Sequence, residues 1–247
     1  MVGLQFYHGD LVVSEIPHEP WFWGTLALGF LFIAVFNLMA ATAQKVGVSV
    51  ASVATKMSLV IPVLFGVLVY NEELSLLKIV GILLALAAVY FASAKEKSIA
   101  VEKSSLLLPI MVFLGSGIID TSIKYIQEVH IGEDDYPIFS ATVFAAAATI
   151  GILFILIKSI KMPLKVNFKN VLGGIALGIP NYFSIYFLLK ALQNDTLNSA
   201  SVFTINNVAI VMFSTLLGIL LFKERISVKN WGGITLAVVS IILVVFF

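Results

Sequence analysis

The polar side chains of this sequence that could do chemistry lie mostly inside long apolar segments, and Lys56 is the clearest case. It is the ninth residue of the apolar segment 48–70. With a helical rise of about 1.5 Å per residue, it lies about 12 Å from the nearer end of that segment. A charge at this depth costs a few kcal/mol unless it is paired or faces water. We interpret Lys56 as a cavity-facing residue that contacts an anion or releases its proton easily. A lysine that snorkels or bonds a backbone carbonyl is the alternative.

Asp120 and Lys124 stand one helical turn apart in the segment 105–127, so their side chains share a helical face. An ion pair between them would reduce the cost of both charges. Two interpretations remain open: a site for a coupling proton or a substrate, or a self-neutralising pair beside the outer interface.

Pro180 lies midway along the segment 170–192, and Asn181, Tyr182 and Tyr186 follow it. A proline cannot donate to the carbonyl four residues earlier, so we expect an interrupted helix with exposed backbone groups. The three polar residues are therefore assigned to substrate binding. The alternative is that such groups form hydrogen bonds between packed helices.

Other chemistries are excluded by the residue types. The chain has no cysteine, and His8, His18 and His130 do not have the spacing of metal ligands. It contains no Gly-x-Ser-x-Gly, no phosphate loop and no paired catalytic carboxylates. The net charge of +1 offers no basic surface for nucleic acid. We therefore expect no enzyme activity, no cofactor, no metal site and no nucleic-acid partner.

The segments that must position these residues are long and hydrophobic. The chain is 60% hydrophobic and 12% charged, with a mean hydropathy of +1.05, whereas a soluble domain has about 25% charged residues. A helix needs roughly 20 apolar residues to cross a bilayer. Eight segments are close to that length: 21–43, 48–70, 77–94, 105–127, 136–160, 170–192, 197–222 and 229–247. The sequence predicts an all-α integral membrane protein with eight transmembrane helices.

Basic residues in the short loops predict the orientation. The loops after the first, third, fifth and seventh spans hold eleven of them: Lys45, Lys95, Lys97, Lys103, Lys158, Lys161, Lys165, Lys169, Lys223, Arg225 and Lys229. The opposite ends of the spans hold Lys78, Lys124 and Lys190. We therefore place the basic loops in the cytoplasm and both ends of this chain outside, at a bacterial inner membrane. Trp21, Trp23 and Trp231 begin spans, where an indole prefers the headgroup region.

The sequence also contains an internal repeat. Residues 24–29 match residues 173–178, and the same offset aligns 51–55 with 200–204. Five spans separate equivalent points, and an odd number inverts the second copy relative to the first, as in many secondary transporters. The predicted domains are an incomplete first repeat of three spans, a basic linker and a complete second repeat of five spans, an incomplete 5+5 arrangement: 1–94, 95–104 and 105–247.

The repeat places several polar residues in equivalent positions. Thr55 aligns with Thr204, and Asn206 and Asn207 align with the two residues that follow Lys56. If the copies face each other, these groups form one polar layer. We therefore add Thr55, Asn206 and Asn207 to the predicted substrate-binding residues.

Small residues and an acidic turn in each copy resemble the EamA-type branch of the drug/metabolite transporter superfamily. The residues that carry this resemblance are Ala51, Ser52, Pro62, Gly66, Glu72 and Gly81 in the first copy, and Ala200, Ser201, Gly218, Glu224 and Gly233 in the second. The resemblance implies two halves of five helices around a central cavity that admits small organic solutes. The ends of such proteins usually lie in the cytoplasm, in contrast to the charge count of this chain, and two spans of the first half would be missing here.

These observations together predict a secondary transporter that moves a small organic metabolite or drug by alternating access. Its expected partners are the small-molecule substrate and the lipid bilayer, with proton or sodium coupling and a homodimer as further options. The alternative is a non-transporting membrane protein that serves in packing, assembly or sensing.

The orientation can be tested with single cysteines, because the chain has none of its own. Cysteines in place of Ser98 and Lys165 should be shielded from an impermeant thiol reagent added outside, and a cysteine in place of Gly132 should react. The reversed labelling pattern would show that the charge count is wrong and that the usual topology of the resembled family holds.

Overall fold

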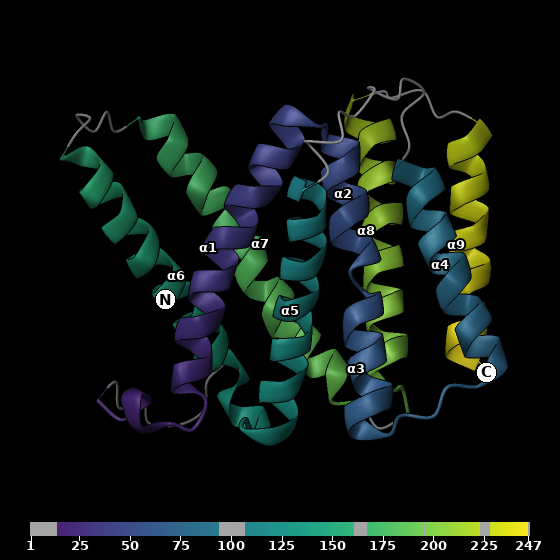
Figure 1. Ribbon diagram of the computed structural model, residues 1–247, viewed down its shortest axis with the longest axis horizontal. Coiled ribbons are helices and arrows are strands. Elements are labelled where there is room, and N and C mark those ends of the chain that lie inside the picture. Colours follow the sequence, from purple (N-terminus) through teal and green to yellow (C-terminus); the bar gives the residue numbers. More distant parts are fainter. Residues whose placement is uncertain (1–13, 94–106, 161–166, 195, 223–227, 247) are drawn as a thin grey trace. The chain divides into compact units, whose positions relative to one another are not determined.

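The computed structural model is helical throughout the residues that it describes, which are 14–93, 107–160, 167–194, 196–222 and 228–246 (Figure 1). The 3-10 helices are η2 (Ile16–His18) and η4 (Glu133–Asp135). The α-helices are α1 (Phe22–Lys45), α2 (Val48–Met57), α3 (Val60–Tyr70), α4 (Leu76–Ser93), α5 (Leu107–Val129), α6 (Tyr136–Ser159), α7 (Phe168–Leu192), α8 (Ser199–Phe222) and α9 (Val228–Phe246).

The prediction of an all-α chain with eight helical spans is confirmed, with α2 and α3 together forming the second span. Within the described ranges, six helices are long and apolar enough to cross a membrane: Phe22–Lys45, Val50–Tyr70, Leu107–Val129, Glu133–Ser159, Phe168–Leu192 and Ser199–Leu217. The two remaining apolar helices, Leu76–Phe91 and Trp231–Phe246, are shorter.

The helices divide between two compact units. Unit 1 comprises residues 1–34 and 122–194, and unit 2 comprises residues 35–121 and 195–247. Helices α1 and α5 each contribute residues to both units.

In unit 1, the first part of α1 packs against α6. Trp21 is buried and meets the Phe139 ring edge-on, with 5.8 Å between the ring centroids. At Gly29, an added Cβ would lie only 2.8 Å from the backbone nitrogen of Ala147, so only glycine allows this approach. Trp21 therefore lies in the packed core of unit 1, and its depth at the headgroup region stays a prediction. Trp23 and Trp231 are exposed.

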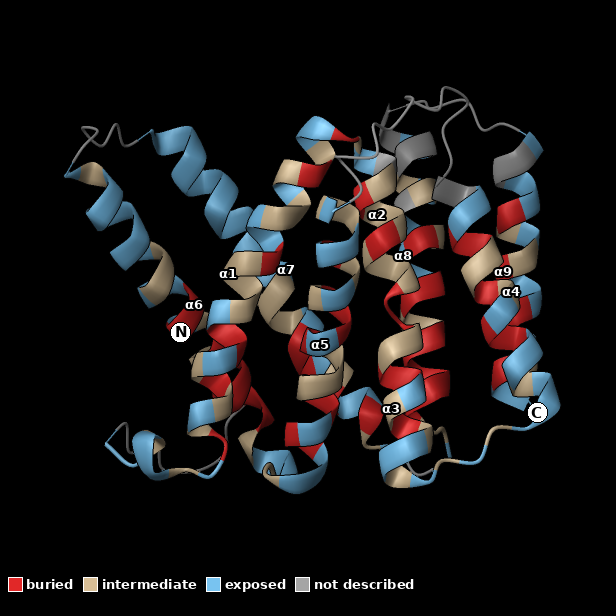
Figure 2. Cartoon of the chain, viewed as in Figure 1, coloured by how far each residue is buried: buried red, intermediate tan, exposed pale blue. Residues whose placement is uncertain are grey.

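Unit 1 also presents a large apolar surface. Residues 152–157 of α6 and 168–180 of α7 are exposed, and most of their side chains are hydrophobic (Figure 2). Such a surface would be unfavourable in water, whereas lipid tails solvate it without penalty. The exposure therefore agrees with the predicted bilayer environment.

In unit 2, the last spans of the two repeats pack together. Ser240 Oγ on α9 donates to the Gly81 carbonyl on α4 at 2.8 Å, and a Cβ on Gly81 would lie 2.6 Å from Val244 Cγ2. Leu59, Val63, Ile82, Ala200 and Val244 form one buried core cluster. A small residue thus lets two helix backbones approach closely, which is the main source of helix association in lipid.

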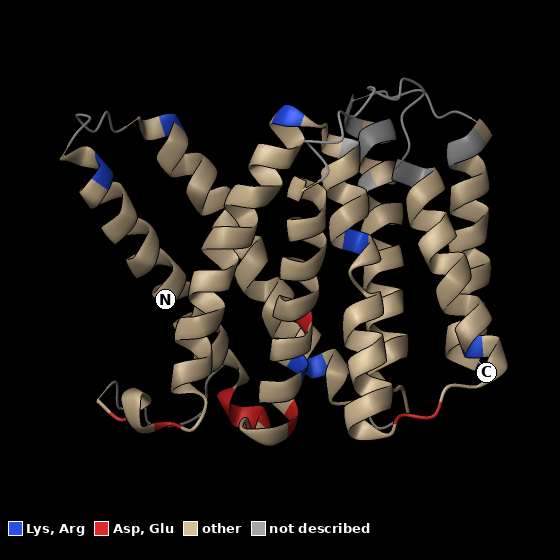
Figure 3. Ribbon diagram, viewed as in Figure 1, with Lys and Arg blue, Asp and Glu red and all other residues tan. Residues whose placement is uncertain are grey.

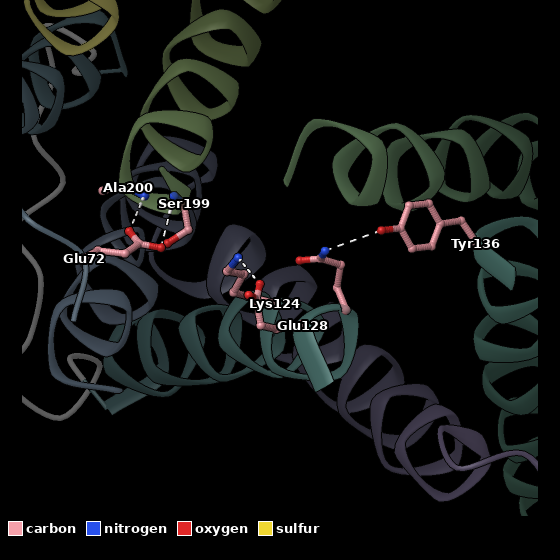
Figure 4. Close-up of polar contacts among 7 residues, drawn as sticks. Glu72, Lys124, Glu128, Tyr136, Ser199 and Ala200 are labelled. Atoms are coloured by element: carbon pink, nitrogen blue, oxygen red, sulfur yellow. Dashed lines mark hydrogen bonds and ion pairs between the residues drawn. The ribbon is translucent and has the colours of Figure 1, made fainter. Parts of the chain in front are cut away.

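The segment after α3 caps the start of α8 within unit 2 (Figure 4). The Glu72 carboxylate accepts from the backbone amides of Ser199 at 3.2 Å and Ala200 at 3.4 Å. The Asn198 side chain accepts from the Ser201 amide at 3.0 Å. Amides in the first turn of a helix have no intrahelical acceptor, and a negative charge there is favourable. Glu72 therefore ties the first repeat to the second.

The backbone around Asn71 directs Glu72 toward this position. Asn71 ends α3 in the left-handed region, with φ of 53°, which asparagine tolerates better than most residues. Its amide and the Glu72 amide both donate to the Gly66 carbonyl. A Cβ on Gly66 would lie 2.9 Å from Glu72 Oε2 and 2.8 Å from Ser199 Oγ, so glycine makes room for the carboxylate.

Glu72→Gln should lower the free energy of unfolding by about 1 kcal/mol, because the charged cap of α8 is lost. The measurement is unfolding of the purified protein in micelles. Glu73→Gln is the matched control: it removes the same charge, but Glu73 is exposed and Asn198 contacts only its backbone carbonyl. Equal losses in the two variants would contradict the capping role.

Candidate functional site

The second span is broken near its middle. Helix α2 ends at Met57 and α3 begins at Val60. Pro62 lies four residues after Ser58 and has no amide hydrogen to donate to the Ser58 carbonyl. The Ile61 amide bonds that carbonyl instead, at 2.9 Å. The local hydrogen bonding is therefore rearranged within an apolar segment.

The Ser58 side chain completes the rearrangement. Its hydroxyl donates to the Thr55 carbonyl at 2.5 Å, and its own amide donates to the Lys56 carbonyl. Backbone groups in lipid must find partners within the protein. A serine at this position thus allows the span to break without exposing the Thr55 carbonyl.

Lys56 lies in the last turn of α2, directly before the break. Its side chain is half-buried. The carbonyl end of a helix carries a partial negative charge, which favours a cation there. The break therefore creates a helix end inside the span that stabilises the lysine predicted from the sequence.

Asp120 on α5 lies within electrostatic range of Lys56. The two charges interact electrostatically within unit 2, and Asp120 is half-buried. The approach of α5 to α3 depends on Gly117, where an added Cβ would lie 2.7 Å from Ile61 Cβ. Gly117 is one turn before Asp120, so the missing side chain at 117 brings the carboxylate toward the broken span.

Two hydroxyl residues of α5, Ser116 and Thr121, are close to Asp120 in the sequence. The side-chain oxygens of Ser116 and Thr121 are buried and have no hydrogen-bond partner among the residues described. Ser116 is four residues before Asp120 and shares its face. We call Lys56, Asp120, Ser116 and Thr121 the polar cluster. It combines a cation, a carboxylate and two hydroxyls that can each donate a hydrogen bond.

The predicted polar residues of α2 and α8 differ in whether their side-chain donors already form hydrogen bonds within the protein. Thr55 Oγ1 donates to the Ala51 carbonyl at 2.9 Å, and its repeat equivalent Thr204 donates to the Ala200 carbonyl at 2.7 Å. Asn207 is buried and donates to the Phe203 carbonyl at 3.0 Å. Their donors are therefore used inside their own helices, while their oxygens can still accept.

Asn206 differs from its neighbour. It is half-buried, and its amide group makes no hydrogen bond with the described part of the chain. An amide offers two donors and an acceptor. Among the predicted residues of unit 2, Asn206 therefore keeps its full hydrogen-bonding capacity.

In unit 1, α7 runs without interruption through Pro180. The expected break at this proline is therefore wrong. The Asn181 amide donates to the Leu177 carbonyl at 2.8 Å, so it supports the helix rather than opening it. Prolines inside transmembrane helices are tolerated where such local bonds form.

Tyr182 and Tyr186 form an aromatic face on α7. Their rings stack with 6.4 Å between centroids, and Lys190 Nζ lies 5.0 Å from the centroid of the Tyr186 ring. The Tyr182 hydroxyl donates to the Pro137 carbonyl at 3.3 Å. Acidic residues gather between α5 and α6 (Figure 3), and Glu133 among them is within electrostatic range of Lys190. Helix α7 thus presents an aromatic and cationic face within unit 1.

Lys124 is buried and forms an ion pair with Glu128, with 2.6 Å between Nζ and Oε2 (Figure 4). The sequence analysis did not identify Glu128 as a partner of Lys124. Glu128 lies four residues after Lys124, and Asp120 lies four residues before it. One turn away, Gln127 donates to the Tyr136 hydroxyl at 3.4 Å. The pairing of Asp120 with Lys124 stays a prediction.

Sequence reasoning also missed the roles of Ser58 and Pro62 at the break, Ser116 and Thr121 beside Asp120, and Glu72 at α8. A proline with a serine four residues earlier is a signal that could have located the break. No group of His, Cys, Asp or Glu suited to a metal ion occurs in the described segments.

Comparisons with known proteins agree with this architecture. The family model of the EamA-like transporter family matches residues 3–94 and 104–246. An uncharacterized protein of Haemophilus influenzae is 32% identical over 241 residues, which cover 97% of this chain and 78% of that protein. A protein of known crystal structure, 14% identical in sequence, superposes with a TM-score of 0.73. The match covers 99% of this chain and 82% of that protein's chain, and at this identity it supports the fold alone.

Proposed function

Because this chain belongs to the EamA-like transporter family, we propose that it is a secondary transporter that carries a small organic metabolite or drug by alternating access. The chain is an integral membrane protein of a family of transporters, not of enzymes.

One observation carries the proposal: a half-buried lysine stands at a helix break within an apolar span. A charge and rearranged backbone bonds inside lipid both reduce stability, so a bundle that only packs gains nothing from them. Broken helices are used in transporters to present polar groups near the bilayer midplane. Lys56 and the break are therefore assigned to solute binding.

The remaining predicted residues extend the proposed site. Thr55 stands beside Lys56, and Asn206 and Asn207 offer amide groups on α8. In unit 1, Asn181, Tyr182 and Tyr186 on α7 offer an aromatic surface and hydrogen-bonding groups, and their role in binding an organic solute is proposed from the sequence. The inverted repeat would let each half take the conformation of the other and open the site to either side.

The cellular setting is part of the proposal. The charge count favours a bacterial cytoplasmic membrane with the ends of this chain outside. Coupling to a proton or sodium ion and assembly into a homodimer are further parts of it.

Lys56→Ala should reduce solute uptake into proteoliposomes by roughly tenfold, the equivalent of about 1.4 kcal/mol of binding, while the inserted amount stays the same. Lys45→Ala is the matched control, since Lys45 is an exposed lysine at the end of α1 and should leave uptake unchanged. A parallel loss of inserted protein and uptake would favour a packing role for Lys56.

Alternating access can be tested with cysteines in place of Asn181 and Asn206. Each should react with thiol reagents from either side of the membrane, and a transported solute should protect both. Reaction from one side under every condition, or no protection by any transported solute, would reject alternating access and favour the non-transporting alternative.

A further inference from the structure

The polar cluster of unit 2 holds two opposite charges that compensate each other without direct contact. Lys56 and Asp120 interact electrostatically, but they form no ion pair of the kind that joins Lys124 to Glu128. The N–H groups of the Lys56 ammonium therefore form no direct bond to a carboxylate of the described residues. Ser116 and Thr121 add buried hydroxyls that lack an acceptor in the described structure. The Lys56 ammonium can only donate, and each hydroxyl can donate one hydrogen bond, so the group can offer donors to an anionic ligand.

An anion that binds Lys56 changes the charge balance of the cluster. Two negative charges, the ligand and Asp120, would then share one cation at the middle of an apolar span. Two like charges at close range in a desolvated site cannot both remain ionised at low cost, so one of them takes up a proton. An organic anion derived from a strong acid cannot do so near neutral pH, which leaves the carboxylate of Asp120.

We propose that the polar cluster binds a small monoanionic solute on Lys56 together with one proton on the Asp120 carboxylate. No covalent bond to the solute forms: the proton moves from the solution to a carboxylate oxygen, and it leaves again when the anion departs. The charge of the cluster is then the same with and without its ligands. If the proposed transport function holds, on which this step rests, the anion and the proton cross the membrane together.

Few other titratable groups can substitute for Asp120 in this role. The segments of unit 2 that pack against α5 are α1, through Val35 beside Gly115, and α3, through Ile61 beside Gly117. The described titratable residues in these parts of α1 and α3 are Lys45 and Tyr70, each the last residue of its helix. On α5 itself, Lys124 follows one turn later and pairs with Glu128. Asp120 is the carboxylate nearest to Lys56 along these helices.

The test measures protonation of Asp120 directly, by infrared difference spectroscopy of the full chain in micelles over a series of pH values. A protonated carboxyl gives a distinct band, which Asp120→Asn should remove. The probe anion is methanesulfonate, which stays charged and has no carboxyl band. It should raise the midpoint pH of the Asp120 band by about one unit, a tenfold gain in proton affinity. Methanesulfonamide, its neutral analogue, should leave the midpoint unchanged.

The variants separate this linkage from a general salt effect. Lys56→Gln should abolish the shift, while Lys56→Arg and the control Lys45→Gln should keep it. No titrating Asp120 band, or a midpoint that methanesulfonate does not move in the unmodified protein, overturns the proposal without reference to any variant. The measurement needs no transport. If methanesulfonate shifts the Asp120 midpoint but no solute is transported, only the proposed function is rejected. If a solute is transported but the midpoint does not shift, only this inference is rejected.

Discussion

The hydrocarbon of a bilayer offers no hydrogen bonds, so every polar group inside a span must find its partner within the protein. This constraint explains the arrangement at the centre of unit 2. Pro62 withdraws one donor from the span, and the Ser58 hydroxyl and the Ile61 amide supply bonds to nearby carbonyls. The break survives because these replacements are local. It also leaves a helix end next to Lys56, which a continuous helix would not provide.

The same solvent removes the hydrophobic effect as a force between helices, so close contact must replace it. Glycines provide that contact at the positions that matter for the site. Gly117 brings α5 to α3 and hence Asp120 toward Lys56, and Gly66 leaves space for the Glu72 carboxylate at α8. Packing and electrostatics are therefore linked: a larger side chain at either glycine would move a charge as well as a helix.

Hydropathy was sufficient to predict the spans, because a segment of about 20 apolar residues has few alternatives to a membrane helix. The individual contacts were harder to predict. The presence of a proline did not locate the helix break: α7 continues through Pro180, whereas the second span breaks before Pro62. Trp21 is buried against Phe139 because a neighbouring helix reaches it, and a span boundary alone cannot indicate that neighbour. Lys56 was identified from its depth, but Asp120, which is within electrostatic range of it, lies on another helix, 64 positions along the chain from it.

The two repeats show that the break and the charge belong together. At the repeat offset of 149, Thr55 corresponds to Thr204, and both threonines bond the carbonyl four residues earlier. One residue later the copies diverge, since Lys56 corresponds to Ile205 and Pro62 to Val211. Helix α8 is continuous across the equivalent positions. A lysine in an unbroken span would lack the helix end that favours its charge, and a proline without polar neighbours would disrupt the span for no gain. Both residues are present together in one copy and absent together in the other, which supports the proposed role of Lys56 at the break.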